Sequence, residues 1–159
     1  MTRIKPHHLI DIICGFGAGL VSPTPSPYGH ALHLVTPQVL ANPDELVLME
    51  LGADDICAPC RHNREGVCDD VIEAAHLPPA LRSKQAYNLL MDQRWSARLQ
   101  LRQDEMLSVR DFCLRVAGAS DDLRDIYAEQ PAAYAVDKSD RLARGCERLL
   151  AVPKRHRQR

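Results

Sequence analysis

The segment 50–70, ELGADDICAPCRHNREGVCDD, constrains the fold more than any other part of the sequence. It carries Cys57, Cys60 and Cys68 in a polar stretch that follows neither the period of a helix nor that of a strand. The two-residue gap lets the sulfurs of Cys57 and Cys60 face one centre. Gly66 allows the turn that brings Cys68 back to them. The segment therefore predicts a loop organised around three thiols.

Three thiols in one loop indicate a metal site, because thiolates are preferred ligands of zinc and of iron–sulfur clusters. Arg61 and His62 add positive charge that would stabilise thiolates. The spacing is compatible with an iron–sulfur cluster and equally with a zinc site completed by His62 or His76. A redox-active dithiol is disfavoured, because no strand leads directly into the Cys-Ala-Pro-Cys pair and no βαβ pattern surrounds it.

A fourth ligand would have to come from elsewhere in the chain, from Cys14, Cys113, Cys146 or a nearby histidine. Cys113 lies on an apolar helical stripe and is expected to be a core thiol. Cys146 also lies on such a stripe, but Gly145 precedes it, and glycine inside a helix costs about 1 kcal/mol relative to alanine. A close backbone approach to a cluster would explain that cost. Cys146 is therefore a candidate ligand as well as a candidate core residue.

The segment 5–17, KPHHLIDIICGFG, predicts a short buried helix that starts at a proline. His7, Asp11 and Cys14 share one face of it. On an otherwise apolar helix these polar side chains need partners. Asp11 is expected to orient His7, which would act as a general acid–base or activate the Cys14 thiol. The alternative is a hydrogen-bonded histidine beside a small buried thiol. His8 lies on another face and is expected to contact the loop or a ligand.

The remaining chain is predicted to be mostly helical. The apolar run ELVLMEL at 45–51 predicts one strand, and 30–40 is an apolar segment broken by a proline. Helices are predicted over 69–75, 83–90, 103–117, 120–130 and 139–150. The fold class is therefore mostly α, a small α+β protein in which a helical domain has one or two short strands and an inserted cysteine-bearing metal loop.

Composition narrows the class of protein further. The chain has 159 residues, which suits one domain, and 20 basic against 21 acidic side chains. This near-neutral balance and an aromatic content of 4% argue against nucleic-acid binding. No apolar run is long enough to span a membrane. A signal peptide is not expected, so the cysteines are expected to stay reduced in a cytoplasmic protein.

Several of these stretches together resemble DUF1284, a family of small bacterial and archaeal proteins suggested to bind an iron–sulfur cluster. They are KPHHLIDIICGFG, NPDELVLMELGADDICAPC at 42–60, the return at Cys68, and more weakly a late Gly-Cys pair. Lys5 replaces an arginine of the family pattern, and Asp11 stands where the family often has a cysteine. Asp54 and Asp55 match its acidic pair.

The resemblance implies a single iron–sulfur-binding domain over 1–152. The last residues, 153–159, are basic and are expected to form a frayed tail. The resemblance favours an iron–sulfur cluster over zinc. It also implies a set of four cluster ligands, Cys57, Cys60, Cys68 and Cys146. Cys14 is the alternative to Cys146 in this set.

Three functions follow as hypotheses. The first is an enzyme whose [4Fe–4S] cluster acts as a Lewis acid on a small-molecule substrate, in lyase or desulfidase chemistry, with His7, His8 and Asp11 as catalytic groups. The second is an iron–sulfur protein that transfers electrons to a redox partner protein. The third is a zinc-stabilised Cys₃His or Cys₄ binding module. Neither nucleic acid nor membrane is expected as a partner. The shared-site hypothesis further predicts that the first helix lies close to the cysteine loop, with His7 or His8 near the Cys60 sulfur.

Overall fold

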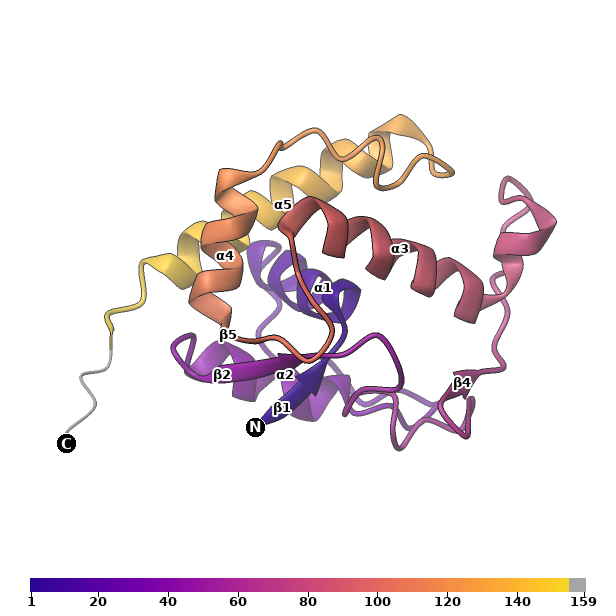
Figure 1. Cartoon of the computed structure of the whole chain (residues 1–159), viewed down its shortest axis with the longest axis horizontal. Helices are drawn as coiled ribbons and strands as arrows, with labels where there is room; N and C mark the ends of the chain where they lie inside the picture. The colour runs from indigo at the N-terminus through magenta and orange to yellow at the C-terminus, as the bar shows by residue number, and fades with distance from the viewer. Residues whose placement is uncertain (155–159) are drawn as a thin grey trace.

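The computed structural model describes residues 1–154 and is built around helix α1 (Pro6–Gly17), which packs against α5 (Ala132–Leu150) and α3 (Lys84–Leu99) (Figure 1). Pro6 opens α1 because a proline has no N–H to leave unpaired in the first turn. Leu9, Ile10 and Ile13 are fully buried. The helix predicted from the N-terminal segment is confirmed.

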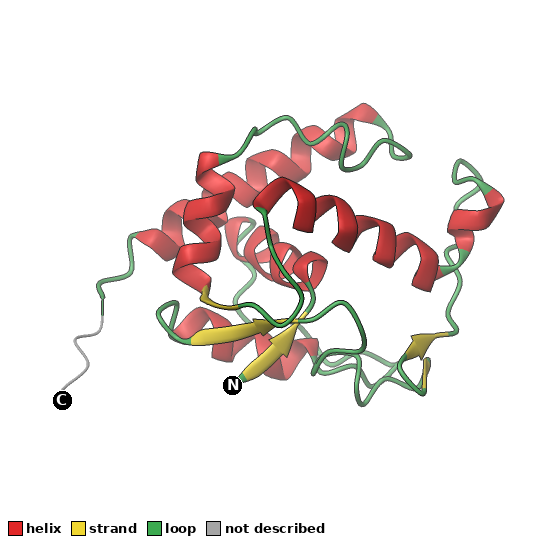
Figure 2. Ribbon diagram, viewed as in Figure 1, coloured by secondary structure: helices red, strands yellow, loops and turns green. Residues whose placement is uncertain are grey.

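A small three-stranded sheet lies below α1, in the order β1-β2-β5 (Figure 2). The strands are β1 (Thr2–Ile4), β2 (Leu46–Met49) and β5 (Met106–Ser108). β2 pairs parallel with β1 and antiparallel with β5. Because β1 and β2 are parallel, they end at the same edge of the sheet. The start of α1 and the cysteine loop therefore leave the sheet side by side.

The other elements complete a mostly helical protein with small α+β character, as the sequence predicts. Besides the predicted strand, which is β2, the structure forms β1, β5 and a hairpin. The hairpin consists of β3 (Asn63–Arg64) and β4 (Val67–Cys68). The remaining helices are α2 (Leu32–Ala41), the 3₁₀ helix η1 (Pro79–Arg82) and α4 (Val109–Gly118). Ser83 caps α3 and Ser108 caps α4 through their side-chain oxygens.

Two predicted helices do not form. Residues 69–75 are extended or in turns, because Asp69 and Asp70 do not cap a helix; Asp69 binds Arg64 and Asp70 binds Lys84. Residues 120–130 form turns rather than a helix, and Arg98 donates hydrogen bonds to the carbonyl oxygen of Ser120 in that segment.

Two other helices start elsewhere than predicted. The helix expected from residue 103 begins only at Val109, because residues 106–108 pair with β2 as strand β5. The last helix begins at Ala132 instead of Ser139, directly after Pro131. Of the predicted basic tail, residues 155–159 lie outside the described part of the chain. Within residues 1–154, no helix has both the length and the apolar character needed to cross a membrane.

The contact between α1 and α5 depends on two glycines. A Cβ atom at Gly145 would lie 2.0 Å from the carbonyl oxygen of Ile13, and one at Gly17 would lie 1.9 Å from that of Arg141. Both distances are far below van der Waals contact, and the blocking atoms are backbone. Gly145 therefore serves close helix packing, and the expectation that it lets the backbone approach a cluster is wrong.

Replacing Gly145 with valine is expected to lower the free energy of unfolding by about 3 kcal/mol, since the two helices must separate to admit the side chain. Urea denaturation followed by circular dichroism measures the loss. Gly118→Val is a matched control, because no atom lies within 4 Å of a Cβ at that position. Equal losses in the two variants would contradict this account of the interface.

Candidate metal centre

The buried carboxylate of Asp54 joins the cysteine loop to the start of α1. One of its oxygens accepts hydrogen bonds from the backbone N–H of Lys5 at 2.9 Å and from Nδ1 of His8 at 2.7 Å. The other accepts the backbone N–H of Cys57 at 2.9 Å. Burial alone would raise the pKa of Asp54, but these hydrogen bonds outweigh it and hold the pKa well below its usual range. The prediction that the first helix lies close to the loop is confirmed at Cys57.

The loop turns twice to collect its thiols. Cys60 donates its backbone N–H to the carbonyl oxygen of Cys57 at 2.9 Å, which closes the first turn. The hairpin of β3 and β4 follows, with Glu65 at φ 52° and Gly66 at φ 94° as its central pair. Positive φ at both positions is the pattern of a tight hairpin turn, and glycine adopts it without strain. The hairpin places Cys68 opposite Asn63, back beside the first turn.

Cys57, Cys60 and Cys68 line one small cavity. Its volume is about 20 Å³, and Lys5, Asn63 and Gln85 complete its walls. Lys5 is the residue directly before α1, and its Nζ lies 3.7 Å from Sγ of Cys57. Each of the three cysteines is half-buried. The structure thus brings together the three loop cysteines predicted from sequence and adds a buried lysine that sequence reasoning treated only as a replacement for arginine.

The thiol of Cys57 is protonated at neutral pH. Burial raises its pKa to about 12, even though the positive charge of Lys5 lowers it. A nucleophilic or redox-active cysteine instead needs a depressed pKa. The environment of Cys57 therefore argues against a thioredoxin-like dithiol. A metal would deprotonate this thiol on binding.

His8 is held in one tautomer. A carboxylate only accepts hydrogen bonds, so Nδ1 of His8 donates to Asp54 and Nε2 carries the lone pair. Burial lowers the pKa of His8, and the neighbouring His7 lowers it further. Ligand atoms of His8, Asp54 and Cys57 all lie within 4.8 Å of one another, so the three side chains could hold a metal ion. A histidine whose second nitrogen binds a carboxylate is the usual arrangement at metal sites.

His7 forms a second histidine–carboxylate pair beside the first. Its Nδ1 and its backbone N–H both donate to Asp92 of α3, at 2.9 and 2.8 Å, and the two histidine rings lie 4.2 Å apart. The expected pairing of His7 with Asp11 is wrong, because Asp11 forms an ion pair with Lys138 of α5. Sequence reasoning missed Asp92. Asp92 is 1% exposed in the structure, and its local sequence pattern does not indicate that it is buried against His7.

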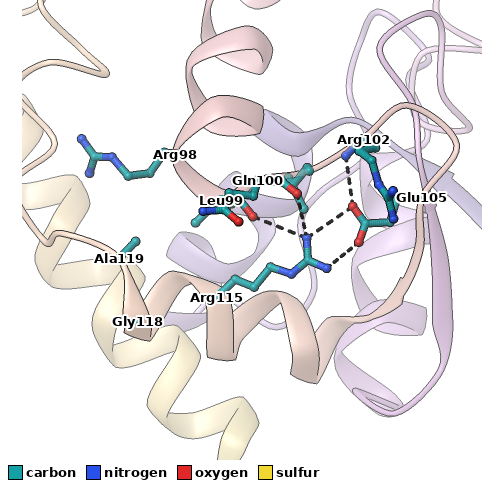
Figure 3. Close-up of a pocket in the computed structure, with 9 residues that line it drawn as sticks. Arg98, Leu99, Gln100, Arg102, Glu105, Arg115, Gly118 and Ala119 are labelled. Carbon is teal, nitrogen blue, oxygen red and sulfur yellow. Dashed lines mark hydrogen bonds and ion pairs between the residues drawn. The ribbon is translucent and has the colours of Figure 1, made fainter.

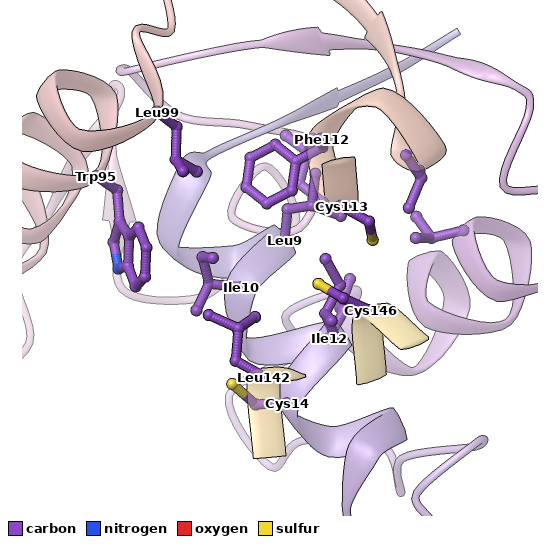
Figure 4. Close-up of a cluster of buried hydrophobic side chains, with 14 of the residues drawn as sticks. Leu9, Ile10, Ile12, Cys14, Trp95, Leu99, Phe112, Cys113, Leu142 and Cys146 are labelled. Atoms are coloured by element: carbon purple, nitrogen blue, oxygen red, sulfur yellow. The ribbon is translucent and has the colours of Figure 1, made fainter. Parts of the chain in front are cut away.

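The other three cysteines lie in the hydrophobic core, apart from the loop cavity (Figure 4). Cys146 on α5 points toward Cys113 on α4, and Cys14 lies beside α5, where its thiol donates to the carbonyl oxygen of Lys138 at 3.7 Å. Cys113 is a core thiol, as predicted. Neither Cys146 nor its substitute Cys14 is brought to the loop cysteines, because α5 crosses α1 near Ile13, at the end of α1 away from the loop.

The two histidines considered for a zinc site also have other partners. Nδ1 of His62 lies 2.8 Å from a carboxylate oxygen of Asp69, and Nε2 of His76 lies 2.9 Å from the side-chain oxygen of Gln130. Neither histidine lines the cavity of the three thiols. His8 does not line this cavity either, but within residues 1–154 its ring nitrogen lies within 4.8 Å of ligand atoms of Asp54 and Cys57.

A larger cavity lies elsewhere, between the end of α3 and α4 (Figure 3). It is bordered by Arg98, Arg102 and Arg115 and measures about 830 Å³. Arg115 donates to Glu105 and to two backbone carbonyls, and Arg98 is paired with Asp125. The charges of Arg98 and Arg115 are therefore already paired within the protein.

Searches with this chain against protein-family models, curated proteins and solved structures find no match. The similarity to DUF1284 therefore stays a prediction, and the following proposals rest on the geometry of the chain itself.

The buried thiol of Cys14 makes folding stability sensitive to alkaline pH. Burial raises its pKa from 9.0 to about 12. Its contribution is therefore complete below pH 9 and is lost as the pH rises toward 12, at about 1.4 kcal/mol per pH unit. Denaturation of the reduced, metal-free chain over this range should show a shallower decline for Cys14→Ala than for the wild type. Parallel declines would contradict the assignment.

Proposed function

We propose that this chain is an iron–sulfur protein whose [4Fe–4S] cluster is held by Cys57, Cys60 and Cys68, with one iron left for a small-molecule substrate. The observation that carries the proposal is that three thiols line a single half-buried cavity, while the other cysteines of the chain lie in the core. Three protein thiolates leave one coordination position open, which suits Lewis-acid chemistry better than electron transfer.

The spacing of the sulfurs supports a cluster over a single zinc ion. Thiolates on one tetrahedral zinc stand about 3.8 Å apart, given a zinc–sulfur bond of about 2.3 Å. In residues 1–154, only His8, Asp54 and Cys57 form a set of three whose ligand atoms lie within 4.8 Å of one another. The three loop sulfurs do not form such a set, so at least one pair of them is farther apart than this limit. Thiolates that bind different irons of one cluster are also farther apart than thiolates that bind a single zinc ion.

The charges around the loop support an anionic group. The first turn of α1, with the positive end of its helix dipole, lies against the loop. Lys5 contributes a buried ammonium beside Cys57. Burial lowers the pKa of Lys84, at the start of α3, but the hydrogen bond to Asp70 and the charge of that carboxylate outweigh burial and raise the pKa. A cluster bound by three thiolates is negatively charged and would be stabilised by these groups.

The residues beside the loop can move a proton. A bound cluster would supply a Lewis-acidic iron for a hydroxyl or thiol leaving group, as in a dehydratase or a desulfidase. His8 is neutral and can accept a proton at Nε2, and Asp54 would stabilise the imidazolium that forms. His7, held by Asp92, packs against the ring of His8 in a tilted arrangement, with the ring centroids 4.2 Å apart, and so restricts its position. Asp11 has no part in this proposal, because it pairs with Lys138.

A zinc site is the second candidate, and the cavity volume favours it. A space of about 20 Å³ holds roughly one water-sized atom, so a single ion enters with less rearrangement than a cluster. His8 would then be the fourth ligand of a Cys₃His site, oriented by Asp54 in the manner of other zinc-binding histidines.

Anaerobic purification followed by iron, sulfide and zinc analysis of the same sample separates the two candidates. We expect a brown protein with about four irons and four sulfides per chain. His8→Ala should then keep the cluster and change its spectral response to added small hydroxy acids. A colourless protein with about one zinc, lost in His8→Ala, would replace the proposal with the Cys₃His site. A reversible reduction with no response to small molecules would favour an electron carrier.

A further inference from the structure

A second cavity, independent of the cysteine loop, lies between α3, α4, α5 and the turn that follows α4. Its volume is about 380 Å³, within the range of small-molecule sites. It shares no lining residue with the cavity of the three thiols. Ligand binding in this cavity is therefore independent of the proposed metal centre.

The interior of this cavity is apolar. Trp95, Leu123, Leu142 and Cys146 form buried parts of its wall. The polar edge of Trp95 is already satisfied, since its Nε1 donates to the hydroxyl of Tyr127 at 3.1 Å. The indole of Trp95 therefore has no free hydrogen-bond donor for a ligand. The walls favour an apolar body such as an aromatic ring or a branched aliphatic chain.

Small side chains keep the cavity open to solvent. Ala117 on α4 and Ala143 on α5 both line it and are both exposed. A larger side chain at either position would extend over the opening without disturbing the core. The two helices therefore leave an entrance that a single substitution can close.

The rim of the cavity is acidic. Asp121 and Glu147 are exposed carboxylates that line it, and neither has an ion-pair partner within residues 1–154. No lysine or arginine lines the cavity. The nearby arginines of α5 point to the opposite side, where Arg144 and Arg148 donate to carbonyl oxygens at the end of α1. Charge complementarity therefore selects a cationic head group.

We propose that this cavity binds a small hydrophobic amine, with its apolar body against Trp95 and its ammonium between Asp121 and Glu147. Trp95 is the single tryptophan of the chain, so the tryptophan fluorescence of the protein comes from a side chain that lines this cavity.

The test is a fluorescence titration of the full chain with 2-phenylethylamine at neutral pH, excited where the probe does not absorb. We expect a saturable change with a dissociation constant of about 1 mM or less. Phenylacetate has the same apolar body and the opposite charge, and it should bind about tenfold more weakly. An amine that fails to saturate, or equal binding of amine and carboxylate, would overturn the proposal.

Two variants locate the binding. Ala143→Phe should abolish the saturable change, whereas Ala133→Phe, at an exposed position of the same helix that does not line the cavity, should not. The double variant Asp121→Asn, Glu147→Gln should remove the preference for the amine over phenylacetate. Both substitutions lie at exposed positions, so the fold is retained and circular dichroism verifies this. Unchanged binding in Ala143→Phe, or an unchanged preference in the double variant, would contradict the assignment.

Discussion

Replacing Asp54 with alanine is expected to lower the free energy of unfolding by about 3–5 kcal/mol, the range found when one partner of a buried charged network is removed. The carboxylate is 1% exposed and accepts hydrogen bonds from three donors, on Lys5, His8 and Cys57. Without it, two backbone N–H groups and an imidazole lose their partner in a buried position. Urea denaturation of the metal-free chain measures the loss.

The adjacent aspartate provides the control. Asp55 is exposed and accepts one hydrogen bond, from the backbone N–H of Arg3 at 2.9 Å. Asp55→Ala is expected to cost less than about 1 kcal/mol. Asp54→Asn removes the negative charge but keeps the shape of the side chain and one acceptor oxygen, so it measures the contribution of the charge. A loss no larger for Asp54→Ala than for Asp55→Ala would refute the role of Asp54 as the link between helix and loop.

Replacing any one of Cys57, Cys60 or Cys68 with serine is expected to remove the bound metal. The loss of a direct ligand should exceed the roughly 10- to 100-fold loss of affinity that follows removal of a residue that only hydrogen-bonds to a ligand. The measurement is the metal and sulfide content per folded chain after anaerobic purification. Circular dichroism establishes that each variant is folded.

Cys146→Ser is the matched control for these ligands. Its thiol lies in the core beside Cys113, so the variant should lose some stability and keep its full metal content. Metal loss in Cys146→Ser with the fold intact would return this residue to the ligand set that the resemblance implies. Full metal content in Cys60→Ser and Cys68→Ser would instead restrict the centre to His8, Asp54 and Cys57.

The sequence was most informative where one local signal decided the structure. A proline at the start of an apolar stretch located α1, and Ser83 located the start of α3. The helix predicted over 103–117 was wrong in its first turns. Met106 and Val109 fit a helical period, but residues 106–108 are bound by β2, a partner distant in sequence. Long-range pairing of this kind leaves no periodic trace in three residues.

The site was predictable in its thiols and not in its surroundings. Cysteine spacing and one glycine were enough to place the three sulfurs together. The partner of His7 was out of reach, because Asp92 lies 85 residues away along the chain. Gly145 misled for a related reason: a glycine beside a cysteine suggested a cluster, whereas the group that requires the glycine is a backbone carbonyl of another helix.

The packing of α1 against α5 has a consequence for the order in which the molecule assembles on the ribosome. The apolar surface of α1 is made first, but its principal partner spans residues 132–150. Until that segment is synthesised, the side chains of Leu9, Ile10 and Ile13 lack most of their cover. Lys5 and His8 lie at the start of this helix, beside the cysteine loop. The helix that borders the loop therefore gains its full support only after residues 132–150 have been made.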